Sequence, residues 1–163
     1  MKPGERAYVA VIGAGDQATP ERRQQAEDVG RELARHGAVV VCGGLAGVME
    51  AACRGAKAEG GTTLAILPGT DRRAANPFVD VAVATGLGEL RNGLVVRSAD
   101  AVVAVGGEFG TLSEIAQALK AGKPVVGVGT WDIPGVVPVD DPAAAARSAL
   151  DLSRLSRDRP HSR

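Results

Sequence analysis

Aromatic residues are scarce in this sequence, which holds one Trp, one Tyr and two Phe among 163 residues. Proteins that bind single-stranded nucleic acid on a platform of stacked aromatic side chains need more of them. The charges are also balanced, with 19 Lys and Arg against 19 Asp and Glu, so no general attraction to a phosphate backbone exists. We therefore expect no nucleic-acid partner.

Cysteines, histidines and long apolar runs are equally few. Two cysteines, Cys42 and Cys53, are typical of reduced thiols in the cytoplasm rather than of a disulfide framework. No run approaches the roughly 18 apolar residues of a membrane helix, and the first residues lack an apolar signal region. His36 and His161 lie far apart without Cys or acidic partners at ligand spacing. We therefore expect a cytoplasmic protein with no membrane partner, no metal and no cofactor.

Short runs of Val, Ile, Leu and Ala alternate with longer segments of helical periodicity along almost the whole chain. The short runs do not alternate with polar residues, which predicts strands buried on both faces, as in a parallel sheet. The predicted strands span residues 7–12, 38–42, 62–67, 101–105 and 124–128. The weaker run at residues 79–84 fits either a short strand or an extended connection.

Helices are predicted between these strands. Thr19-Pro20 and Asp141-Pro142 each combine an N-cap residue with proline at the first helical position. The predicted helices span residues 20–36, 48–58, 88–98, 112–121 and 142–152. Strand and helix alternation with right-handed crossovers predicts an α/β fold, one Rossmann-like domain with a doubly wound, mostly parallel sheet. The domain covers residues 1–153, and residues 154–163 are expected to form a flexible C-terminal tail.

The 22 glycines are not scattered evenly, and eight of them form three clusters directly after predicted strands. In an open α/β sheet these loops lie at the carboxyl ends of the strands, where ligands bind. Glycine lets backbone N–H groups approach an anion, and a following helix N-terminus adds partial positive charge. The pattern therefore predicts a phosphate-bearing small molecule as the partner. The candidate ligand-binding residues in and beside these loops are Gly13, Gly15, Gly43, Gly44, Gly47, Glu50, Asn92, Gly106, Gly107, Gly110 and Thr111.

Two common nucleotide sites do not fit this sequence. Residues 13–18 match the G-x-G-x-x-A dinucleotide pattern, but the next helix begins late, at Pro20. The second strand then ends in Cys42-Gly43-Gly44, with no carboxylate for a ribose diol. No Gly-Lys-Ser/Thr follows a glycine loop, which excludes a Walker P-loop.

Two charged positions leave alternatives open. Thr111 and the first helical N–H groups can hold a phosphate with Glu114 facing the same crevice, or Thr111 and Glu114 form a capping box. Arg91 is either a solvated residue of a surface helix or a cation of the ligand site.

The sequence resembles the Lonely Guy (LOG) family and related Rossmann-like proteins formerly labelled lysine decarboxylases, over roughly residues 7–130. The resemblance rests on Gly43-Gly44-Leu45-Ala46-Gly47-Val48-Met49-Glu50 and on Gly106-Gly107-Glu108-Phe109-Gly110-Thr111-Leu112-Ser113-Glu114, which looks like the family motif P-G-G-x-G-T-x-x-E. It implies a phosphoribohydrolase that cleaves the N-glycosidic bond of AMP or a cytokinin riboside 5′-monophosphate. Arg91 and Glu114 would then be catalytic, and the protein would be a homodimer or higher homo-oligomer.

Three positions depart from the LOG pattern: Val105 replaces the motif's proline, Asn92 replaces the lysine after Arg91, and Glu50 replaces a glycine. At these positions the sequence is more similar to a sister group that includes molybdenum-cofactor carrier proteins. The alternative function is therefore a non-catalytic carrier that holds a phosphorylated pterin. DNA-uptake proteins with a similar domain are a third class, which the neutral charge and sparse aromatics disfavour.

Apolar residues beside Arg91 bear on the oligomeric state. Val95 and Val96 give the predicted helix more apolar surface than a solvated crossover helix needs, which favours a homodimer formed through helices next to the site.

Overall fold

Seven strands form one parallel sheet in the computed structural model, which describes residues 3–157. The strands are β1 (Tyr8–Gly13), β2 (Val39–Cys42), β3 (Thr62–Leu67), β4 (Val81–Ala84), β5 (Ala101–Val105), β6 (Val125–Val128) and β7 (Val136–Pro138). Their order across the sheet is β4-β3-β2-β1-β5-β6-β7, and every neighbouring pair is parallel. The predicted doubly wound α/β fold is confirmed.

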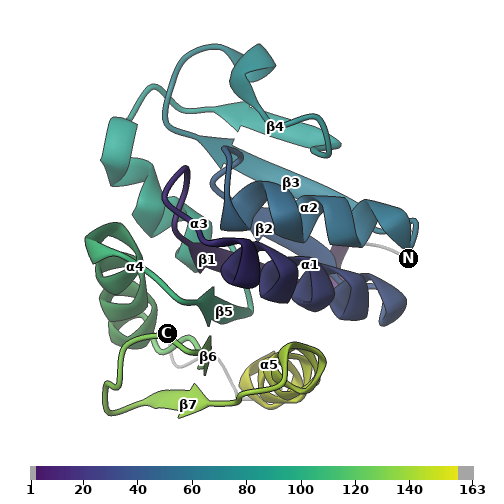
Figure 1. Ribbon diagram of the computed structural model, residues 1–163, viewed down its shortest axis with the longest axis vertical. Coiled ribbons are helices and arrows are strands. Elements are labelled where there is room, and N and C mark those ends of the chain that lie inside the picture. Colours follow the sequence, from purple (N-terminus) through teal and green to yellow (C-terminus); the bar gives the residue numbers. More distant parts are fainter. Residues whose placement is uncertain (1–2, 158–163) are drawn as a thin grey trace.

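Helices cover both faces of this sheet (Figure 1). One face carries α1 (Pro20–Arg35), α2 (Val48–Ala58) and α5 (Pro142–Arg157), and the other carries α3 (Asn92–Arg97) and α4 (Phe109–Lys120). Alternate residues of β1 separate accordingly, because successive side chains of a strand point to opposite faces. Val9 and Val11 join the core under α1, α2 and α5, whereas Ala10 and Ile12 join the core under α3 and α4. Within residues 3–157, no helix is long and apolar enough to cross a membrane.

Local signals at the helix starts act as predicted. The hydroxyl of Thr19 accepts a hydrogen bond from the Arg22 N–H at 3.3 Å and caps α1, with Pro20 at the first helical position. The carboxylate of Asp141 accepts from the Ala144 N–H at 2.7 Å at the start of α5. Both pairs satisfy N–H groups that have no partner inside the helix.

Several predicted boundaries were wrong. The expected helix at residues 88–98 is a 3₁₀ turn, Gly88–Arg91, followed by the short α3. The strand β7 was not predicted, because it has only three partly exposed residues, one of them Pro138, at the edge of the sheet. The tail expected from residue 154 starts too early, since α5 continues to Arg157. The remainder of that tail, 158–163, lies outside the described residues.

The residues expected at a subunit contact are also placed differently. Val95 and Val96 are fully buried in this chain's own core under α3 and α4, so they cannot face a partner. Leu87, Leu90 and Leu94 are the exposed apolar residues of this segment. The homodimer or higher homo-oligomer therefore stays a prediction.

Candidate functional site

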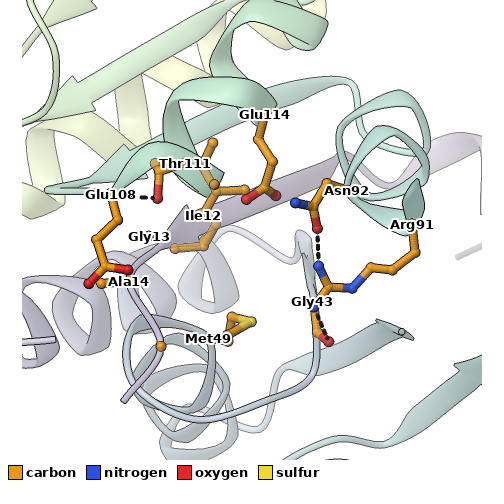
Figure 2. A pocket seen from close by; sticks show the side chains of 13 residues that line it. Ile12, Gly13, Ala14, Gly43, Met49, Arg91, Asn92, Glu108, Thr111 and Glu114 are labelled. Atoms are coloured by element: carbon orange, nitrogen blue, oxygen red, sulfur yellow. Dashed lines mark hydrogen bonds between the residues drawn. The ribbon is translucent and has the colours of Figure 1, made fainter. Parts of the chain in front are cut away.

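A cavity of about 150 Å³ lies at the carboxyl ends of β1 and β5 (Figure 2). The chain runs from β1 outward to β4 and then returns to β5 on the other side of β1, so the order of the sheet reverses here. Ligands of open α/β sheets bind at this kind of switch point. Eight of the predicted site residues line the cavity: Gly13, Gly15, Gly43, Arg91, Asn92, Gly110, Thr111 and Glu114.

Arg91 is the cation of this cavity and is only 9% exposed. Its Nη2 donates to the carbonyl oxygen of Gly43 at 3.4 Å, and its Nη1 donates to the side-chain oxygen of Asn92. Its buried Nε finds no hydrogen-bond partner within residues 3–157. Burial lowers the pKa of Arg91 from its ordinary value, and the opposite charge of Glu114 counters this effect. A buried guanidinium with an unused donor favours an anionic ligand.

Glu114 is the acidic group of the cavity and comes from the second turn of α4. Burial raises the pKa of its carboxyl to about 7, against the opposing influence of the Arg91 charge. The neutral form of this carboxyl therefore persists to a higher pH than that of an exposed glutamate. A group in this state can donate a hydrogen bond to a ligand oxygen or accept one from a ligand hydroxyl.

The N-terminus of α4 opens into the same cavity but is capped differently from the prediction. The helix begins at Phe109, with Glu108 as N-cap, and the Glu108 N–H donates to the Thr111 hydroxyl at 3.4 Å. The capping box therefore joins Glu108 to Thr111, and Glu114 takes no part in it but lines the cavity. The N–H groups of Phe109 and Gly110 precede the first intrahelical bond, from Leu112 to Glu108 at 3.0 Å. No atom within 4 Å would obstruct a Cβ at Gly110, so an anion can approach this end of the helix.

Other predicted site residues do not line the cavity. Gly44 donates its N–H to the Cys42 sulfur at 3.3 Å. Gly47 approaches the residues after β1 so closely that a Cβ there would lie 2.0 Å from the Gly15 oxygen. Both glycines have positive φ and serve the local packing of the loop. Glu50 does not line the cavity itself but a neighbouring depression, with Asn76, that shares Gly15 and Met49 with it.

Gly106 and Gly107 line an adjoining cavity rather than the one that contains Arg91. Five further residues line the first cavity and were not predicted: Val11, Ile12, Ala14, Met49 and Glu108. Met49 and Glu108 stand inside the two quoted motifs. Their place close to the glycines of these motifs was a signal that could have identified them.

The two cysteines lie together beside the site but outside the cavity. Cys42 and Cys53 are free and buried, with their sulfur atoms 3.5 Å apart. Hydrogen bonding from Cys53 and from the Gly44 N–H lowers the pKa of the Cys42 thiol, and burial together with Cys42 raises that of Cys53.

A family model matches residues 6–151 of the chain, and it describes the SLOG cluster4 family. The chain belongs to the SLOG cluster4 family. An uncharacterised protein of Archaeoglobus fulgidus is 48% identical over 117 residues, which are 72% of this chain and 76% of that protein. The resemblance to LOG-like and molybdenum-cofactor-carrier-like Rossmann proteins is thereby confirmed.

Two solved structures are similar to this SLOG cluster4 protein over nearly their whole length. The molybdenum cofactor binding protein of the phototrophic bacterium Rippkaea orientalis is 36% identical, with a TM-score of 0.83, and the match covers 90% of this chain and 96% of that one. The molybdenum cofactor carrier protein of Chlamydomonas reinhardtii is 35% identical, with a TM-score of 0.81 and coverage of 90% and 98%.

Proposed function

We propose that this protein binds and carries a phosphorylated pterin, with the molybdenum cofactor as its cargo. The observation that carries the proposal is the buried Arg91 guanidinium, which lines the cavity at the switch point and whose Nε–H has no partner among the described residues. The similarity to a molybdenum cofactor binding protein and to a carrier protein, over 90% of this chain in both cases, favours this cargo.

The phosphate would lie between Arg91 and the N-terminus of α4. Arg91 supplies a full positive charge, and the N–H groups of Phe109 and Gly110 supply donors at the positive end of the helix dipole. Asn92 accepts from Arg91 Nη1 and so holds the guanidinium in place. The neutral form of Glu114 donates to a phosphate oxygen, so this carboxyl does not need to repel the anion.

The similarity to a molybdenum cofactor binding protein and a carrier protein, rather than the chemistry of the cavity, favours a carrier over a hydrolase. A carboxyl whose pKa is raised by burial also suits the proton donor of glycosidic cleavage, so Glu114 fits both functions. A carrier needs only reversible binding of its cargo.

Binding of the cargo is the direct test. The protein is mixed with molybdenum cofactor released from a denatured molybdoenzyme and separated by gel filtration, and molybdenum and oxidised pterin are measured in the protein fraction. We expect both to elute with the wild type and to be lost with Arg91→Met. The control is Arg97→Gln, which removes the same charge from an exposed position of α3. Absence of pterin from the wild-type fraction contradicts the proposal.

A phosphoribohydrolase is the second candidate, because Arg91 and Glu114, the residues that would be catalytic in a LOG-like enzyme, line one cavity. Incubation with AMP and with isopentenyladenosine monophosphate, followed by chromatography, measures release of the free base. If base is released and Glu114→Ala abolishes the release, the hydrolase replaces the carrier as the function of this site.

A further inference from the structure

A second cavity of about 410 Å³ adjoins the first and shares Ala14 and Glu108 with it. Sites for small molecules usually have volumes of about 300–1,000 Å³. The first cavity, at about 150 Å³, has room for a phosphate and its immediate neighbours but not for a fused ring. The ring of a phosphorylated ligand must therefore extend beyond it, and the second cavity is contiguous.

Arg22, from the first turn of α1, is built into this second cavity. A Cβ at Gly129 would lie 2.3 Å from its Nη1, and a Cβ at Gly106 would lie 2.9 Å from its Nε. These two glycines, in the loops after β5 and β6, have no side chain and so leave room for the guanidinium. Nη1 donates to the Gln25 side chain at 2.9 Å, and no carboxylate of residues 3–157 forms an ion pair with Arg22. Donors of a fixed planar group thus remain available to a ligand.

An aromatic pair stands at the same place. Trp131 lines the second cavity and stacks on Phe109, with ring centroids 6.2 Å apart and an angle of 27° between the planes. Phe109 is 80% exposed and Trp131 is 38% exposed. One of the four aromatic residues of the chain therefore lines this cavity and a second stacks on it, both with exposed surface, which favours a planar ligand.

Hydrogen-bond donors and acceptors both line the cavity beside Trp131. Glu108 is exposed at the boundary of the two cavities and supplies a carboxylate acceptor, and Figure 2 shows its carboxylate turned toward Ala14. Thr130 also lines the cavity, and its buried hydroxyl has no partner among the described residues. Arg22 donates and Glu108 accepts, so the cavity distinguishes the two edges of a heterocycle.

We propose that the second cavity binds the 2-amino-4-oxo ring that pterins share with guanine. Trp131 stacks on the ring, Arg22 donates to the oxo oxygen, and Glu108 accepts from the 2-amino group. Arginine recognises the oxo edge of guanine in the same way, and carboxylates accept from exocyclic amino groups. Adenine presents an amino group where Arg22 needs an acceptor and is disfavoured. The position of the ring relative to the phosphate rests on the proposed function.

Calorimetric titration with GMP, IMP and AMP tests this assignment, because IMP lacks only the 2-amino group and AMP also lacks the oxo oxygen. We expect GMP to bind more tightly than IMP and IMP more tightly than AMP, by about tenfold at each step. Arg22→Gln should remove the preference for IMP over AMP, and Glu108→Gln the preference for GMP over IMP. Trp131→Ala should weaken all three by about tenfold, with most of the loss restored in Trp131→Phe. Arg97→Gln is the matched control for charge.

Equal affinities for the three nucleotides in the wild type overturn the assignment, as do preferences that persist in Arg22→Gln and Glu108→Gln. Ribose 5-phosphate, which has no ring, separates this failure from failure of the proposed function. Its binding to the wild type with loss in Arg91→Met supports the phosphate site whatever the nucleotides do. A titration with 6-hydroxymethylpterin phosphate then compares the two sources of the ring. If this compound binds more tightly than GMP, the natural ligand is a pterin; if it binds more weakly, the natural ligand is a guanine nucleotide.

Discussion

Arg91 donates from Nη2 to the carbonyl oxygen of Gly43 at 3.4 Å, across 48 residues of sequence. The contact joins the loop after β2 to the turn before α3. A Cβ at Gly43 would lie 2.7 Å from Nη2 and 3.0 Å from Cζ of Arg91, and 2.8 Å from the Met49 sulfur. The position of the buried cation therefore depends on the absence of a side chain at Gly43.

Substitution Gly43→Ala should displace the Arg91 guanidinium without unfolding the chain. The atoms that meet the new methyl group are the ends of flexible side chains, which can move, and φ of Gly43 is not positive. We expect the affinity for ribose 5-phosphate to fall by about tenfold, which corresponds to the loss of one charge-assisted hydrogen bond. Calorimetry measures the affinity, and Gly69→Ala, in an open loop position, is the control. Unchanged affinity would show that the cation does not hold the phosphate.

Substitution Arg91→Met should raise stability while it removes anion binding. The guanidinium is buried, and its Nε is unpartnered within the described residues. A buried charge without full compensation opposes folding, and an apolar side chain of similar length avoids that cost. We expect a gain of about 1 kcal/mol, which raises the melting temperature of a protein of this size by about 2–4 °C. Thermal unfolding with and without ribose 5-phosphate measures both effects, and a fall of several degrees would make Arg91 a structural residue.

The sheet was predictable because each of its inner strands is a short apolar run between helical patterns. The strand β7 was not, since an edge strand of three residues has no such run. The glycine loops pointed to the edge of the sheet at which the first cavity lies, because ligand crevices form at the carboxyl ends of parallel strands. Arg22 and Trp131 could not be assigned, because they meet only when the loops after β5 and β6 are placed beside the start of α1.

Glycines outside the loops have another cause, the close approach of two helices. A Cβ at Gly30 in α1 would lie 2.0 Å from the Ala52 oxygen of α2, and one at Gly55 in α2 would lie 2.0 Å from the Glu27 oxygen of α1. The two helices pack backbone to backbone at these points. Composition alone does not separate glycines of this kind from glycines that surround a ligand.

Substitution Gly30→Ala should therefore destabilise the protein. The new methyl group meets backbone atoms of α2, which can yield only if the two helices move apart. We expect a loss of about 1–3 kcal/mol in the free energy of unfolding, although alanine has the higher helix propensity by about 1 kcal/mol. Urea denaturation of the variant beside Gly69→Ala measures this loss. A stabilised Gly30→Ala protein would mean that α1 and α2 are further apart than described.

The Glu114 carboxyl should make stability depend on pH. Its pKa is raised to about 7 in the folded protein from an ordinary value of 4.5. Between these two pH values the folded chain holds a proton that the unfolded chain has released, so the free energy of unfolding falls as pH rises through this window. The full difference is on the order of 2 kcal/mol, since the carboxyl is only partly buried.

Substitution Glu114→Gln should remove this dependence, because the amide has no proton to lose in this range. The wild type and the variant should unfold at similar temperatures near pH 5, and the variant should be the more stable near pH 8. Glu50→Gln, which lies outside the cavity, should follow the wild-type curve. The affinity of the wild type for ribose 5-phosphate should fall as pH rises through 7, because the ionised carboxyl repels the phosphate. The affinity of Glu114→Gln should depend on pH only through the ionisation of the phosphate itself. Parallel stability curves for the wild type and Glu114→Gln would place the carboxyl in solvent, with an ordinary pKa and no part in binding the anion.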